Sequence, residues 1–220
     1  MSSHDPFTSY EEAWEFIYGP EGIAPKASEW FARQFPDGHN TSLRPLVEDV
    51  LQQLPDFGPN LPRGGTDCEL HPRALKLIAR YGQDYKPDLE QARHFHTQEL
   101  KPHPGQCFTN SWRLMRAMNK GGMGLVYVEG LAFGYLIEPM LHAWVSYGLD
   151  DEMAVDWSQY PGCPWNRYLG IAITEEEHAM LQAIAFPDTP ERPLALLDIE
   201  HFPLIEEPLA KLLADRERPA

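Results

Sequence analysis

The chain has 220 residues and a formal net charge of −15, which comes from 18 basic and 33 acidic side chains. This charge argues against nucleic acids and anionic membranes as partners, because binding to phosphates requires a positive field. Hydrophobic residues form 43% of the sequence and prolines number 21, so we expect one folded domain built from short elements and rigid turns.

Two absences in the sequence narrow the class of protein further. There is no apolar run of roughly 18 residues, the length that a membrane-spanning helix needs, and residues 1–6 lack the basic and then apolar pattern of a secretion signal. The three cysteines, Cys68, Cys107 and Cys163, are odd in number and irregularly spaced, so they do not predict a disulfide framework. These features together favour a protein of the reducing cytoplasm.

Helical patterns dominate the first half of the chain. A capping-box pattern at residues 9–12 opens a short helix, and residues 43–54 place leucine and valine on one face of a 3.6-residue period. A further helix is predicted over residues 71–82, beginning at a His-Pro pair and ending at a glycine. The polar residues 83–104 predict a loop or an irregular helix.

A turn at Gly105 delivers a cysteine, Cys107, to the first turn of the next predicted helix. Behind it Phe108, Trp112 and Met115 recur at helical spacing, so one face of this helix is expected to pack on a core.

The pattern then changes to that of a sheet. Strands are predicted over residues 125–130, 141–147, 153–157 and 168–173. The short turn between the second and third of these predicts an antiparallel hairpin. A second capping box at residues 174–177 opens a helix that runs through Ile184, and the tail that follows is expected to contain only an amphipathic turn or two around Leu209.

This order of elements predicts an α+β fold with a helical N-terminal half and a nucleophile-bearing helix packed on an antiparallel sheet. We expect a single domain over residues 1–220. Within it, residues 1–100 form a helical elaboration, residues 101–185 a catalytic core, and residues 186–220 a proline-rich acidic tail.

Cys107 is the first candidate for chemistry. A cysteine at a helix start faces unpaired backbone N–H groups and the positive end of the helix dipole, and both favour the nucleophilic thiolate. His142 alternates with Leu141 and Ala143 on its predicted strand, and Asp156 lies on the neighbouring strand. The three residues can therefore form a triad of nucleophile, base and orienting carboxylate.

Several residues around this triad are candidates for binding the substrate. The backbone N–H of Cys107 is one expected donor to an oxyanion, and the second could come from Gln106, His103 or Asn110. Trp144, beside the predicted base, could shape a substrate pocket, although most tryptophans simply belong to the core.

A cysteine at a helix start, a histidine on a strand and an aspartate on the next strand resemble the papain-like superfamily, especially its transglutaminase-like branch. The order is also similar to that of arylamine N-acetyltransferases. The resemblance covers residues 104–173, and the turn here reads Gly-Gln-Cys-Phe in place of the Cys-Gly-Ser-Cys-Trp of papain itself. It implies a thiol hydrolase or acyltransferase without a cofactor, acting through a thioester on an amide or acyl group of a small molecule or peptide.

Two other hypotheses fit the same residues. The fold could lack catalysis and serve as a binding or phage- or defence-related accessory protein. Alternatively, His94, His96 and His103 with Cys107 could hold zinc, although their spacing does not repeat a compact ligand pattern. Glu129, at the end of a predicted strand, is expected to be solvated, and the oligomeric state is not predicted.

Overall fold

The computed structural model describes residues 42–45, 47–48, 70–95, 101–103, 106–134, 140–157, 165–187 and 195–217. The helix predicted at residues 9–12, most of that at 43–54, and both Cys68 and Cys163 lie outside the described residues. The helical N-terminal half therefore stays a prediction.

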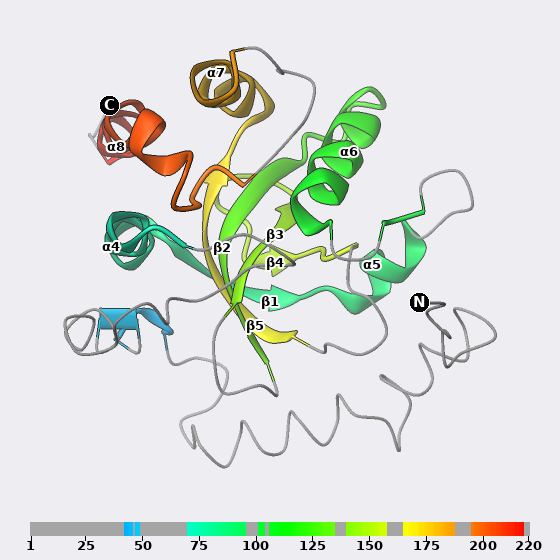
Figure 1. The fold of residues 1–220 in the computed structure, drawn as a ribbon. Helices are drawn as coiled ribbons and strands as arrows, with labels where there is room; N and C mark the ends of the chain where they lie inside the picture. The colour runs from blue at the N-terminus through cyan, green and yellow to red at the C-terminus, as the bar shows by residue number, and fades with distance from the viewer. Residues whose placement is uncertain are drawn as a thin grey trace, which may run out of the picture.

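The described part of the chain is α+β, as the sequence indicates. Its elements are α4 (Pro72–Tyr81), β1 (Gln83–Pro87), α5 (Leu89–His94), α6 (Cys107–Asn119), β2 (Val126–Gly134), β3 (Met140–Ser146), β4 (Met153–Ala154), β5 (Trp165–Ile173), α7 (Glu175–Ala185) and α8 (Phe202–Arg216). Figure 1 shows α4, α8, α7 and α6 in an arc around a curled sheet. None of the helices in these ranges combines the length and apolarity that crossing a bilayer requires.

The sheet has five strands in the order β3-β2-β5-β1-β4. The expected antiparallel pairing holds for β2 with β3 and for β2 with β5. Strand β1, which the sequence did not predict, pairs antiparallel with β5 and parallel with β4, so the sheet is mixed. The predicted hairpin is reduced to one antiparallel bridge between Val145 and Val155. That bridge links β3, at one end of the strand order, to the residue directly after β4, at the other end. The sheet is therefore curled and nearly closed on itself.

Apolar side chains pack on both faces of the curl. On the outer face, the helices cover alternate residues of the strands, including Leu141, Ala143 and Val145 of β3. The inner face holds a smaller core whose members are Tyr85, Val126, Val128, Ala132, Trp144, Ala154, Tyr168 and Ala172. His142 alternates with the outer-face residues of β3 and so belongs to the inner face with Trp144.

Two glycines make room on the inner face beside His142. Gly130 of β2 is the register partner of both His142 and Gly170, so the three residues form one row across the sheet. A Cβ atom on Gly170 would lie 2.6 Å from Cη2 of Trp144, which is too close for any other residue. The row thus leaves space for the imidazole and the indole inside the curl.

Local signals explain where the helices begin. Pro72 occupies the first turn of α4, and the Nδ1 atom of the preceding His71 accepts a hydrogen bond from the Arg73 N–H at 3.1 Å. The capping box that opens α7 is confirmed, with Thr174 and Glu177 each bonding to the backbone of the other.

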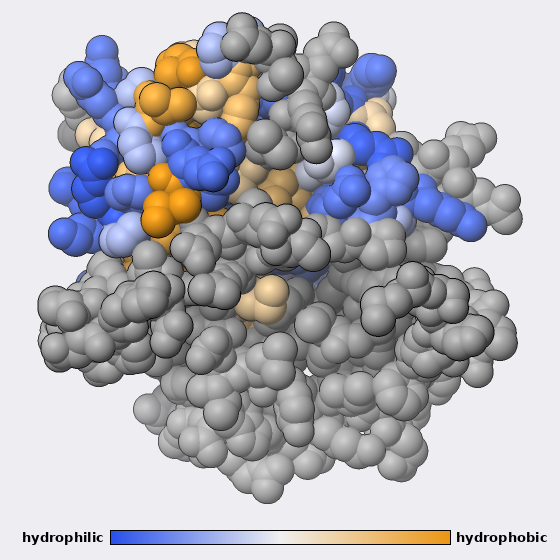
Figure 2. All heavy atoms as spheres, viewed as in Figure 1, coloured by the Kyte–Doolittle hydropathy of each residue, from blue (hydrophilic) through white to orange (hydrophobic). Residues whose placement is uncertain are grey.

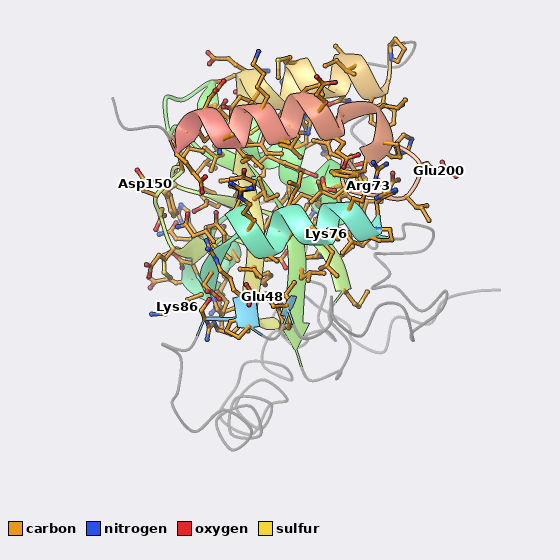
Figure 3. All side chains as sticks on the ribbon, turned by 90° about the vertical axis from the view of Figure 1, so that its left-hand side faces the viewer. Glu48, Arg73, Lys76, Lys86, Asp150 and Glu200 are labelled. Carbon is orange, nitrogen blue, oxygen red and sulfur yellow. The ribbon has the colours of Figure 1, made fainter. Side chains whose placement is uncertain are left out.

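Two segments are more regular than their sequence suggests. Residues 83–104, predicted as a loop or irregular helix, contain the strand β1 and the short helix α5. The tail, where only a turn or two was expected around Leu209, forms the 15-residue helix α8. Figure 3 shows α8 lying along α4, and Arg73 of α4 pairs with Glu206 of α8 at 2.6 Å.

Glu129 is fully buried, which corrects the expectation that it is solvated. Its carboxylate accepts hydrogen bonds from the backbone N–H groups of Leu197 at 2.7 Å and Leu196 at 3.1 Å, and from the Tyr127 hydroxyl at 2.8 Å. Burial raises the pKa of Glu129 to about 7, and these hydrogen bonds lower it only in part. The carboxylate therefore fastens the segment before α8 to the sheet.

A pH dependence of stability follows from this buried acid. Folding favours the protonated form of Glu129, so its contribution is present below the ordinary pKa of 4.5 and is lost as the pH rises through about 7. The loss amounts to about 3 kcal/mol by pH 8. We expect Glu129→Gln to flatten the fall in unfolding free energy between pH 5 and pH 8, measured by urea titration. The exposed Glu176→Gln is the control, and an equal slope in both variants would contradict the assignment.

Candidate active site

The N-terminus of α6 has no side-chain cap. Cys107 is the first residue of the helix, and the residue before it, exposed Gln106, makes no side-chain hydrogen bond to cap it. The first N–H groups of a helix have no intrahelical acceptor, so they remain able to donate to a ligand. Cys107 itself is 6% exposed and is a free thiol.

His142 stands on β3 opposite this helix end. Helix α6 packs against β3, and the Ser111 hydroxyl donates to the Ala143 carbonyl oxygen at 2.9 Å, which fixes the helix on the strand. Because β3 is at one end of the strand order, an imidazole on its inner face can meet the helix N-terminus at the rim of the sheet. His142 is 8% exposed.

The structure brings the three triad candidates together. His142 Nε2 lies 2.7 Å from Asp156 Oδ2, and Cys107 is near enough to His142 to raise the pKa of the imidazole. Since Nε2 is engaged by the aspartate, Nδ1 is the ring nitrogen left for the sulfur. Asp156 directly follows Val155, the residue whose bridge to Val145 closes the curl.

The charges around His142 favour the imidazolium. Burial on its own lowers the pKa of His142, but the negative charges of Asp156 and Cys107, and the hydrogen bonds to both, together raise it well above 6.5. His142 is therefore held mainly as the imidazolium next to Asp156.

Tyr168 of β5 completes the surroundings of the aspartate. Its hydroxyl donates to Asp156 Oδ2 at 3.0 Å, and its ring lies nearly parallel to that of His142, with 6.3 Å between the centroids. Asp156 is 2% exposed, and the side chains of His142 and Tyr168, from two different strands, both hydrogen-bond its carboxylate. The sequence predicted Tyr168 only as a strand residue, and nothing in its spacing indicated this role.

The other predicted site residues are placed differently. Asn110 is fully buried, and both ends of its amide bond the backbone of His103, at 2.9 and 2.8 Å, so it anchors the preceding segment rather than facing a ligand. His103 is exposed, as is Gln106. Trp144 is fully buried between Tyr85 and Tyr168 and therefore belongs to the core rather than to a surface pocket.

The alternative metal site stays a hypothesis. Within the described ranges, no group of three or more His, Cys, Asp and Glu side chains is arranged to hold a metal ion. His94 packs edge-on against the Phe95 ring, and His96 lies outside the described residues.

A separate groove of about 710 Å³ lies between α7 and α8. Met180, Pro208 and Leu212 form its apolar part, and exposed apolar side chains gather over these two helices in Figure 2. It shares no residue with the cluster of Cys107, His142 and Asp156, so it does not bear on the chemistry there.

Comparisons of the chain with protein-family models, curated proteins and solved structures found no match. The function therefore has to be argued from the geometry of the site itself.

Proposed function

We propose that this protein is a cysteine hydrolase or acyltransferase of papain- or transglutaminase-like fold, working through a thioester on Cys107. The observation that carries the proposal is the 2.7 Å hydrogen bond between His142 and Asp156, with Cys107 near enough to His142 to raise the pKa of the imidazole. A cysteine nucleophile needs a base, and the base needs a third group to hold its orientation and tautomer. All three occur here in that order.

The first half of the reaction forms the thioester. The Cys107 sulfur attacks the carbonyl carbon of an amide or ester, and the charge that develops on the carbonyl oxygen is stabilised by N–H groups at the start of α6. His142 gives its proton to the leaving amine or alcohol as the bond to the carbonyl carbon breaks. Asp156 balances the charge of the imidazolium throughout.

The second half releases the acyl group. Water or an acceptor amine attacks the thioester carbon, His142 takes a proton from the attacking atom, and the Cys107 sulfur leaves as a thiolate. Water gives hydrolysis and an amine gives acyl transfer. A reactive thiol of this kind suits the reducing cytoplasm, and the partner is a small amide- or acyl-bearing molecule or peptide.

Trapping the covalent intermediate tests the proposal. After brief exposure to 4-nitrophenyl acetate at pH 6, mass spectrometry of the acid-quenched protein should show one acetyl group on the peptide containing Cys107. Iodoacetamide at the same pH should label Cys107 much faster than Cys68 or Cys163, because a nucleophilic cysteine with a neighbouring base reacts faster than a structural one.

The chain supplies its own matched controls, since it has three cysteines. Cys107→Ala should abolish the adduct, whereas Cys68→Ala and Cys163→Ala should leave it intact. Equal labelling of all three thiols in the wild-type protein would refute the proposal and favour a binding protein of the same fold.

A further inference from the structure

Arg113, six residues after Cys107 on α6, is half-buried and has one donor atom without an acceptor. Among the described arginines it alone makes no hydrogen bond or ion pair, and its Nη1 atom is buried without an acceptor. The partners of the other arginines include a backbone carbonyl for Arg44 and carboxylates for Arg116 and Arg216. In a chain with 33 acidic and 18 basic side chains, an arginine left without a carboxylate is unexpected.

A second unpaired donor lies beside it. Trp157 is 2% exposed, and its Nε1–H has no hydrogen-bond acceptor. The Arg113 guanidinium lies over the Trp157 ring, 6.0 Å from its centroid. A buried N–H without an acceptor costs free energy, so two of them together indicate a place for an acceptor that comes from elsewhere.

These two donors belong to the chain segments that carry the candidate active site. Trp157 directly follows Asp156 in the chain, and its side chain belongs to the same outer-face core as Cys107. Arg113 is six residues from Cys107 on α6, about 9 Å along the helix axis, and helical side chains lean back toward the N-terminus. An extended five-carbon acyl chain spans about 5 Å, and the backward lean of the Arg113 side chain covers the remainder.

We infer that Arg113 and Trp157 bind a carboxylate, and that this carboxylate is the far end of the acyl group transferred by Cys107. One oxygen would accept from Arg113 Nη1 and the other from Trp157 Nε1, which satisfies both donors at once. The substrate class is then a monoamide or monoester of a dicarboxylic acid. The carboxylate site stands on its own, whereas its role in turnover rests on the proposed function.

Binding can be measured without any catalysis. Glutarate is titrated into the ¹⁵N-labelled protein, and the six indole N–H signals are followed by NMR, with that of Trp157 identified from its loss in Trp157→Phe. A new hydrogen bond to an anion should move the Trp157 signal downfield while the others stay in place. Arg113→Gln should weaken this binding by about ten- to a hundredfold, as expected for the loss of a charged hydrogen bond.

Arg116→Gln is the matched control. Arg116 lies on the same helix and also stacks on a tryptophan, at 4.9 Å from the Trp112 ring, but it is exposed and paired with Glu175. It should bind glutarate as the wild type does. If the indole N–H signals of ligand-free Arg113→Gln lie where they do in the wild-type protein, this variant is correctly folded. A Trp157 signal that does not respond, or that responds equally in Arg113→Gln, would overturn the carboxylate site.

Turnover tests the second part of the inference. The 4-nitroanilides of glutarate and of pentanoate have acyl chains of equal length and differ in the terminal carboxylate. The glutaryl compound should react faster than the pentanoyl compound, and Arg113→Gln should remove this advantage. Equal rates in the wild type would overturn the substrate class. If neither compound nor the 4-nitrophenyl ester reacts, the proposed function fails, and the indole signal still decides the carboxylate site.

Discussion

Replacing His142 by glutamine is expected to lower the rate of acyl transfer by roughly 10²–10⁴-fold, the range for losing a general base. Glutamine can still hydrogen-bond Asp156, so the buried carboxylate keeps a partner, but it cannot carry a proton between the sulfur and the leaving group. The thiolate also loses the cation that stabilises it. Alkylation of Cys107 by iodoacetamide at pH 6 should then be slower than in the wild-type protein.

A second histidine–aspartate pair provides the control. His201 Nδ1 lies 2.7 Å from the carboxylate of Asp198, the same length as in the pair between His142 and Asp156. Asp198 hydrogen-bonds the start of α8 and has no cysteine among its bonded partners in the described residues. His201→Gln should keep the wild-type rate and the wild-type pH profile. If both variants lose activity equally, the loss reflects stability rather than chemistry.

Asp156→Asn is the second change expected to have a large effect, a rate loss of about 10²–10⁴-fold with little change in fold. The amide N–H of asparagine would donate to His142 Nε2 and so hold the proton on Nδ1, the nitrogen that must take the proton from Cys107. The negative charge that raises the pKa of His142 is lost as well. Measured against pH, the rate of alkylation should shift toward higher pH as well as fall.

Two variants separate this role from simple packing. Asp198→Asn makes the same substitution in the pair without a cysteine and should leave the rate unchanged. Tyr168→Phe removes one hydrogen bond to Asp156 but keeps the carboxylate and the aromatic ring, so its loss should be much smaller than that of Asp156→Asn. Finding the wild-type rate in Asp156→Asn would exclude Asp156 as the orienting group.

The sequence predicted the part of the site that depends on local periodicity. A cysteine after a turn, followed by apolar residues at helical spacing, located the start of α6, and strand alternation placed His142 on one face of β3. The position of Asp156 next to it followed from a short connection between strands. These signals come from residues close in sequence, where backbone geometry alone determines which side chains share a face.

The remainder depends on contacts that no local pattern encodes. Strand β1 is short and polar, and only Tyr85 among its side chains is buried, so its place between β4 and β5 could not be recognised. Prolines inside α8 concealed that helix. From the sequence, Asn110 was a candidate for facing a ligand and Glu129 was expected to be solvated. The folded chain shows instead that Asn110 bonds the backbone of the segment before α6 and that Glu129 bonds the backbone of the segment before α8.

The bridge between Val145 and Val155 has a consequence for how a substrate can be recognised. It occupies the outer edge of β3 at that point, while β1 occupies an edge of β4. Proteins that bind extended peptides often do so by adding the peptide as another strand at a free sheet edge, which reads backbone rather than side chains. With the strand edges at Val145 and Val155 already paired, a peptide cannot add as a further strand at that point, so the proposed acyl transfer would select its substrate there through side chains.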